Sequence, residues 1–239
     1  MNLDFQAALD TSLSECGLSI SEETKEKLNI YFETLVEWNE KMNLTALTSP
    51  RDVALKHFCD CLKVLSYAKI KEGASVIDVG TGAGFPGLVL KIARPDLKLC
   101  LLDSLQKRLI FLEEVCKKAQ IEDVRFLHSR AEDGARDATL RESFDYAVSR
   151  AVAPMNVLSE YCLPYVKVGG SFLAMKGKEY KEEVSSAQKA IETLGGCISD
   201  VHTFKLSDAG QRAIVCIQKT EKTPDTYPRT GKKIKTKPL

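Results

Sequence analysis

Hydrophobic positions follow two different periods along the chain, and the change between them falls near residue 70. In the first part, apolar side chains recur at steps of three and four, which is the spacing of one helix face: Leu28, Tyr31, Phe32, Leu35, Trp38 and Met42. Ser21, with two glutamates directly after it, is typical of a helix start. Apolar positions over 53–65 predict a further helix. We therefore expect residues 1–70 to form a helical extension.

From about residue 73, short apolar runs alternate with amphipathic stretches that have a helical period. This alternation predicts strand-helix-strand units on a parallel sheet. No helix fits between the last two apolar runs, so these should pair antiparallel. The expected strands cover 75–79, 97–102, 124–127, 146–148, 171–175, 198–204 and 213–218. Residues 71–219 are thus predicted to form an α/β domain with a seven-stranded, mostly parallel sheet that ends in an antiparallel hairpin.

Composition places the chain among ordinary globular proteins, with 44% hydrophobic and 28% charged residues. Residues 1–10 carry no basic residue, unlike a signal peptide, and no apolar run approaches the ~20 residues of a membrane span. The eight cysteines are scattered without a CxxC pair, which favours reduced, mostly buried thiols. We expect a cytoplasmic protein without a membrane partner or a metal site.

Charge is distributed unevenly, although the net charge is only +1. Residues 1–60 hold eleven acidic and five basic side chains, whereas residues 219–239 hold seven basic and two acidic ones. Because lysine and arginine displace the counterions around nucleic acid, the basic tail at 220–239 is a candidate phosphate-binding arm. A solvated, disordered terminus is an equally good interpretation of the same charges.

The strongest motif is the glycine loop at 78–87, DVGTGAGFPG, which follows a predicted strand and precedes a predicted helix. Glycines let the backbone turn sharply and approach a ligand, and the following helix offers free N–H groups. The same residues contain GxGxxG, which alone would suit a dinucleotide enzyme. Asp78 at the strand end gives the acid-x-Gly-x-Gly-x-Gly form that is typical of S-adenosylmethionine sites, and the C-terminal hairpin favours that class too. Asp103, at the end of the next strand, is placed to accept hydrogen bonds from ribose hydroxyls.

Several ordered blocks resemble one known family, the bacterial 16S ribosomal RNA (guanine-N(7))-methyltransferases once named glucose-inhibited division protein B. The resemblance covers nearly the whole chain. The blocks are WNEKMNLT at 38–45, HFCDCL at 57–62, the glycine loop, LDS at 102–104 with KR at 107–108, SRAV at 149–152, KG at 176–177 and YPR at 227–229. Two departures are Cys61, where the family usually has serine, and the lysine-rich tail after Arg229.

The resemblance implies a class I methyltransferase (Rossmann-like) fold with S-adenosyl-L-methionine as the cofactor. Together with the motifs above, it implies these cofactor contacts: Gly80, Gly82, Gly84, Phe85, Asp103, Ala131, Glu132 and Arg150. Ligands of open parallel sheets lie beyond the carboxyl ends of the strands, which agrees with these positions. Phe85 could instead be a core aromatic, and Glu132 a helix-cap carboxylate. Arg150 stands inside an apolar block, where a charge is costly unless it is paired.

The implied reaction is methylation of guanine N(7) in 16S ribosomal RNA or the small ribosomal subunit, with no DNA partner. The ring nitrogen carries no proton, so we expect no catalytic base, and Arg150 is expected to help position the reactants. His57 and Asp60 could touch RNA, but a hydrogen-bonded pair that positions a helix is favoured. The acidic N-terminal helices are expected to pack on the sheet and cap the cofactor pocket. Expected RNA contacts are Arg150, Lys176, Lys178, Arg229, Lys232 and Lys233.

Three other functions remain open at this stage. A methyltransferase with a small-molecule or protein substrate would share the glycine loop, but its activity would not fall steeply with salt. A nicotinamide-dependent oxidoreductase would bind nicotinamide. A non-catalytic RNA-binding ribosome-assembly factor would keep the fold without the activity, and the intact loop at 78–87 speaks against it.

Overall fold

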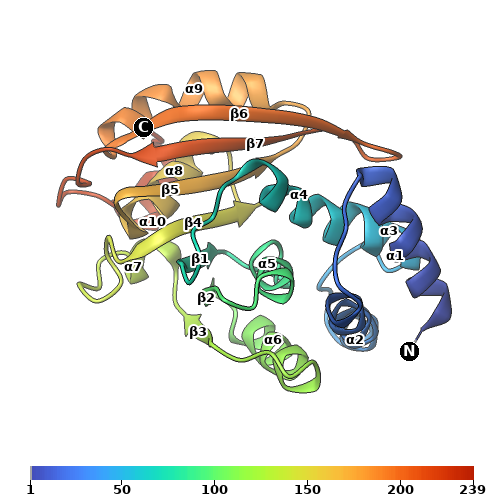
Figure 1. Ribbon diagram of the computed structural model, residues 1–239. Coiled ribbons are helices and arrows are strands. Elements are labelled where there is room, and N and C mark those ends of the chain that lie inside the picture. Colours follow the sequence, from blue (N-terminus) through green and yellow to red (C-terminus); the bar gives the residue numbers. More distant parts are fainter. Residues whose placement is uncertain (1) are drawn as a thin grey trace.

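A seven-stranded sheet organises the structure, a computed structural model that describes residues 2–239 (Figure 1). The strand order is β3-β2-β1-β4-β5-β7-β6. The first five strands are parallel, and β7 runs antiparallel to both β5 and β6. The predicted α/β fold with its terminal hairpin is therefore confirmed. The strands are β1 Ser75–Val79, β2 Lys98–Asp103, β3 Val124–His128, β4 Phe144–Arg150, β5 Val166–Lys176, β6 Gly196–Leu206 and β7 Gly210–Lys219.

Strand β5 begins at Val166, five residues before its predicted start. The added stretch contains Gly169 and Gly170, which have no side chain to contribute to a hydrophobic period. A Cβ on Gly170 would collide with the backbone oxygen of Asp145, so the adjacent strand requires glycine there. The first five residues of the strand were not predicted, because the glycine that allows close pairing also removes the hydrophobic signal there.

The helices agree with the predicted periods, with one local difference. The Ser21 side chain accepts a hydrogen bond from the backbone N–H of Thr24 (3.2 Å) and caps the second helix, as its position predicts. The segment predicted as one helix over 53–65 contains a π-helical turn. The elements are α1 Leu3–Cys16, α2 Glu22–Asn39, α3 Pro50–Asp52, π-helix η1 Val53–Cys59, α4 Asp60–Tyr67, α5 Gly87–Ala93, α6 Gln106–Lys118, α7 Ala131–Gly134, α8 Met155–Cys162, 3-10 helix η2 Leu163–Tyr165, α9 Tyr180–Thr193 and α10 Gly231–Thr236.

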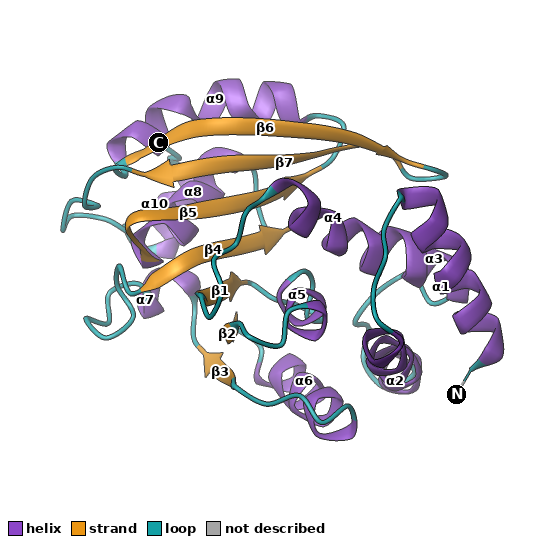
Figure 2. Cartoon of the chain, viewed as in Figure 1, coloured by secondary structure: helices purple, strands orange, loops and turns teal. Residues whose placement is uncertain are grey.

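Helices cover both faces of the sheet (Figure 2). Successive side chains of one strand enter different cores: Val76 packs with the N-terminal helices, α5 and α6, whereas Ile77 packs with α8 and α9. Because both faces are buried, the central strands are apolar on both sides, which explains the continuous apolar runs in the sequence.

The N-terminal extension contacts the glycine loop directly. The phenol of Tyr31 on α2 donates a hydrogen bond to the carbonyl of Ala83, and its ring packs on Phe85 with 5.6 Å between centroids. Phe58 of η1 lies against both rings, at 5.2 Å and 6.0 Å. The extension is thus part of the site, because its buried aromatic residues support the loop from behind.

Two further features concern the cysteines and the helices. Six of the eight cysteines are buried, and no disulfide occurs in the described part of the chain. None of the helices within residues 2–239 combines the length and the apolar character that crossing a membrane requires.

Candidate active site

One cavity of about 920 Å³ opens at the carboxyl ends of the central strands. The loops after β1, β2, β3 and β4 line it, together with residues of η1 and of the C-terminal segment. The strand order reverses direction between β1 and β4, which is where open α/β sheets bind their ligands. The topology therefore places the cavity at the position that the glycine loop predicts.

Asp78 shapes the glycine loop from within. Its Oδ2 accepts hydrogen bonds from the hydroxyl of Thr81 (2.7 Å) and the backbone N–H of Gly87 (2.8 Å), which joins the two ends of the loop. Burial raises the pKa of Asp78 to about 6. The backbone N–H groups of Gly80 and Thr81 both donate to the carbonyl of Leu102, so the loop is also fixed to β2. Asp78 thus supports the site without lining the cavity.

The glycines of the loop do not all have the same role. Gly82 has φ +60° and lines the cavity, and a Cβ there would find its nearest neighbour, the carbonyl oxygen of Gly80, at 4.0 Å. Gly84 has φ +96°, and a Cβ there would collide with the Tyr31 hydroxyl and with Leu112. Gly84 is not among the residues that line the cavity. The structure therefore places Gly80 and Gly82 in the site but gives Gly84, an expected cofactor contact, a packing role.

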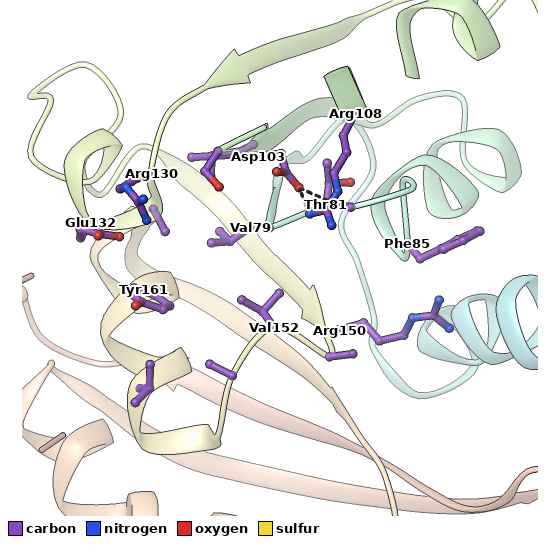
Figure 3. A pocket seen from close by; sticks show the side chains of 18 of the residues that line it. Val79, Thr81, Phe85, Asp103, Arg108, Arg130, Glu132, Arg150, Val152 and Tyr161 are labelled. Carbon is purple, nitrogen blue, oxygen red and sulfur yellow. Dashed lines mark hydrogen bonds and ion pairs between the residues drawn. The ribbon is translucent and has the colours of Figure 1, made fainter. Parts of the chain in front are cut away.

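Asp103 lies at the carboxyl end of β2, directly beside the glycine loop (Figure 3). Its Oδ2 accepts from the backbone N–H of Gly82 (2.9 Å) and from Arg108 Nη1 (3.3 Å), and its Oδ1 accepts from the N–H of Leu105 (2.9 Å). A carboxylate has about four acceptor positions. At least one is left on a side chain that lines the cavity.

Ala131 and Glu132 line the cavity at the start of α7. The phenol of Tyr165 donates to the carbonyl of Ala131 (2.6 Å) and fixes this turn. The Glu132 side chain is largely buried and lies against Gly231 of the C-terminal segment. Arg130 is exposed beside them, so this end of the cavity carries both charge signs.

Arg150 and Phe85 lie at the end of the cavity opposite Glu132 (Figure 3). The guanidinium of Arg150 donates to the carbonyl of Lys56 (3.0 Å) and to Asp60 Oδ2 (3.1 Å), and it stands 4.9 Å from the Phe85 ring centroid. The side chains of Arg150 and Asp60 are 15% and 5% exposed. The charge predicted to be costly unless paired is therefore paired, with a carboxylate and an aromatic face.

His57 connects Arg150 to the N-terminal extension. Burial and the nearby Arg150 charge lower the pKa of His57 to about 3, so the ring is neutral. Since a guanidinium can only donate, Nδ1 accepts from Arg150 Nη2 (3.0 Å), and Nε2 donates to the hydroxyl of Thr45 (2.9 Å). The Asn39 side chain accepts from the N–H groups of Leu44 and Thr45, which holds this segment in the cavity wall. The structure shows His57 and Asp60 each bonded to Arg150 rather than to one another, so the predicted direct pair is replaced by one that Arg150 bridges. This arrangement favours a positioning role over direct RNA contact.

The segment after Arg150 has a strained backbone. Ala151 has φ +57°, a conformation that costs a residue other than glycine about 1–3 kcal/mol. Val152 follows it, lines the cavity and stays 39% exposed. Ser149 donates to the carbonyl of Val79 (2.8 Å) and fixes the strand before the turn. The SRAV block thus directs an apolar side chain into the site at a cost in backbone strain.

The expected RNA contacts divide into two groups. Lys176 bonds to Glu183 (2.7 Å), and Arg229 bonds to the buried Glu160 (2.6 Å), while Arg150 is paired as described. These cations are occupied inside the protein. The remaining three cations are exposed and do not line the cavity: Lys178, Lys232 and Lys233.

Several cavity residues were not expected from the sequence, among them Thr45, Arg108, Arg130, Tyr161 and Lys235. Thr45 and Arg108 stand in blocks that carried the family resemblance, so a signal for them was present. Lys235 had none beyond its charge, because it reaches the cavity only after the tail has folded back on the domain.

Comparison with solved structures assigns the class. The chain is similar to precorrin-6y C5,15-methyltransferase from Geobacter metallireducens, with a TM-score of 0.54 and 16% identity over 67% of this chain and 87% of that one. It is also similar to a ribosomal protein L11 methylase from Lactobacillus delbrueckii subsp. bulgaricus, with a TM-score of 0.52 and 16% identity over 70% and 79% of the two chains. At this identity the likeness shows the fold alone. With the glycine loop and its cavity, it identifies the class I methyltransferase fold.

Sequence comparison then gives the family. The family described as rRNA small subunit methyltransferase G matches residues 24–215. Proteins named ribosomal RNA small subunit methyltransferase G are 47% identical in Oceanobacillus iheyensis, over 91% of this chain and 92% of the relative, and 48% identical in Bacillus cereus, over 96% and 95%. The relative in Clostridium botulinum is 45% identical over 99% of this chain and its own full length. The chain belongs to the rRNA small subunit methyltransferase G family, which confirms the resemblance seen in the sequence.

Proposed function

We propose that this protein transfers a methyl group from S-adenosylmethionine to N(7) of a guanine in 16S ribosomal RNA. Family membership supports the ribosomal RNA substrate. The observation that carries the proposal is one cavity lined by the acceptor carboxylates of Asp103 and Glu132, with the Arg150 cluster at the end opposite Glu132 (Figure 3). Its volume of about 920 Å³ accommodates a cofactor together with a base.

The cavity fits the cofactor chemically. Gly82 leaves open space where a side chain would project, so a ligand can approach the backbone. Ribose hydroxyls and the adenine amino group are donors and need acceptors, which Asp103 and Glu132 supply. We assign the ribose to Asp103, the adenine to Ala131 and Glu132, and the remainder to the backbone of Gly80 and Gly82.

S-adenosylmethionine supplies an electrophilic methyl carbon, which the lone pair of N(7) attacks as the carbon–sulfur bond breaks and its electrons stay on sulfur. N(7) has no proton to lose, so no residue of the protein needs to accept one. His57 fits this assignment, because its Nδ1 lone pair is occupied by Arg150. Alignment of the two reactants then provides the rate enhancement, which can reach about 7–11 kcal/mol.

Arg150 acts as a positioning residue in this proposal. Its charge is neutralised by Asp60, which suits a reaction that leaves the methylated ring positively charged. Through its contacts with Phe85 and His57, it fixes the cavity wall against which the guanine would lie. Its loss should lower kcat while leaving the Kd for the cofactor close to that of the wild type.

RNA would approach over the exposed cations near the mouth. Lys178, Lys232 and Lys233 are available for phosphates, and Arg108 and Arg130 line the cavity itself. The major groove of A-form RNA is too narrow for side chains to read, so the target guanine must be unpaired or splayed out of its helix.

The proposal is tested with small ribosomal subunits from cells that lack this protein. Purified protein is incubated with these subunits and methyl-labelled S-adenosylmethionine, and nuclease digests are analysed by mass spectrometry. We expect one 7-methylguanine, a large rise in KM for the cofactor in Asp103→Asn, and a fall in kcat in Arg150→Ala. Asp200→Asn, an exposed carboxylate on β6, is the matched control and should behave like the wild type. Cofactor binding without label in RNA would overturn the proposal in favour of another methyl acceptor or a non-catalytic assembly factor.

A further inference from the structure

The C-terminal segment, residues 220–239, is folded against the domain by buried polar contacts. At its base, the fully buried Lys219 donates to the carbonyl of Leu163 (2.9 Å) and to the hydroxyl of Thr223 (2.6 Å). Farther along, Arg141 donates to the carbonyl of Tyr227 (2.8 Å). A solvated arm would leave these donors and acceptors to water, so the contacts indicate a fixed position.

Two further contacts hold the second half of the segment. Arg229 forms a bidentate pair with Glu160 of α8, with Nη2–Oε2 at 2.6 Å and Nε–Oε1 at 3.0 Å, and the Glu160 side chain is 1% exposed. Ile234 of α10 is fully buried in the core that covers the α8 and α9 face of the sheet. Figure 1 shows α10 beside α7 and α8, and α10 contacts α8.

This position brings the segment into the cavity wall. Lys235 and Pro238 line the same cavity as Asp103 and Glu132. Gly231 stands directly against the carboxylate of Glu132, and a Cβ on Gly231 would collide with Glu132 Oε1. The absence of a side chain at residue 231 therefore leaves the space that the Glu132 carboxylate occupies.

We infer that residues 220–239 complete the cofactor site, and that Gly231 positions the Glu132 carboxylate toward the cofactor. The inference rests on the proposed placement of S-adenosylmethionine in this cavity. It gives the tail a binding role that is separate from any contact of its lysines with RNA. If the docked tail strengthens cofactor binding, then by linkage the bound cofactor must also stabilise the docked position of the tail.

The first test needs no variant, because the exposed lysines of α10 are trypsin sites that require local opening of the helix. Cleavage after Lys232 and Lys233 is measured with and without S-adenosylmethionine at 100 times its Kd. If an open tail cannot bind cofactor, cleavage slows by up to about 100-fold; we expect at least tenfold. Cleavage after Lys205, in the distant β6–β7 hairpin, should change far less. Equal tail cleavage with and without cofactor would overturn the inference.

The second test measures cofactor affinity by calorimetry in two variants. Gly231→Ala should raise the Kd for S-adenosylmethionine about tenfold, and removal of residues 231–239 should raise it further. Gly177→Ala is the matched control, because a Cβ there meets no atom within 4 Å and the backbone is not left-handed. Wild-type affinity in Gly231→Ala and in the truncated protein would refute a role in binding.

Asp103→Asn separates this inference from the proposed function. If Asp103→Asn binds the cofactor normally, the placement of the cofactor is wrong and both fail. If Asp103→Asn loses affinity while the tail variants keep it, the cavity is the cofactor site and only the role of the tail is refuted.

Discussion

The contact between Arg229 and Glu160 should dominate the stability of the C-terminal segment. Glu160 lies in α8 with its carboxylate 1% exposed, and Arg229 supplies its backbone N–H (2.7 Å), Nε (3.0 Å) and Nη2 (2.6 Å). Arg229→Ala removes two of these three donor groups and the only positive charge paired with Glu160 among residues 2–239. The carboxylate then stays buried with one backbone donor.

The size of the effect follows from this burial. Removing one partner of a buried ion pair costs about 3–5 kcal/mol, because the other charge remains without compensation. The backbone N–H of residue 229 still donates to Glu160 in the variant. We therefore expect the free energy of unfolding to fall by the lower end of this range, about 3 kcal/mol. If the tail detaches, water reaches the Glu160 carboxylate and the cost of its unpaired burial disappears. The free energy of tail detachment is therefore the largest loss of stability that Arg229→Ala can cause.

Urea unfolding followed by circular dichroism measures the global stability, and trypsin cleavage after Lys232 measures opening of the tail. Glu160→Gln combined with Arg229→Met removes both charges and should recover most of the loss. Arg229→Lys should recover little, since an ammonium cannot replace the bidentate geometry. A loss below about 1 kcal/mol in both assays would refute the reasoning. A reduced salt dependence of RNA binding in stable Arg229→Ala protein would restore Arg229 as a phosphate contact.

Three further predictions concern the loop, the histidine and the tail. Gly84→Ala should cost about 3 kcal/mol of stability, because the new Cβ would collide with its neighbours and the left-handed backbone would be strained. Gly82→Ala should cost about 1 kcal/mol and mainly weaken cofactor binding. Urea unfolding measures the stability of the two variants, and calorimetry measures their affinity for the cofactor. His57 has a folded pKa of about 3, so only the unfolded chain takes up a proton as pH falls below 6.5, and stability decreases. The wild type should therefore lose about 2 kcal/mol more than His57→Asn between pH 7 and pH 5, and an equal loss would contradict the assigned pKa. Replacing Lys232 and Lys233 by alanine should reduce the slope of log K for RNA binding against log salt concentration by about 2. An unchanged slope would show that these lysines do not contact phosphates.

Much of the site could be predicted from the sequence because its chemistry is local. The glycine loop and Asp103 stand at the ends of strands, and parallel strands bring such ends together regardless of detail. Ala131 and Glu132 came only from family resemblance, yet they line the same cavity. Gly84 satisfied the motif equally well, but its role depends on Tyr31, which lies 52 residues before the Ala83 carbonyl that it bonds.

The sequence by itself determined the type and order of the elements, the glycine loop and the family. These depend on periodicity and on motifs whose residues are near one another in the chain. Only the tertiary structure decided which charges are free. Arg150 and Arg229 find their carboxylates 90 and 69 residues away, so they are enclosed in the protein, whereas Lys232 and Lys233 remain in water. A cation is equally charged in both settings, and its availability depends on the partner that folding brings to it and on the water that folding removes.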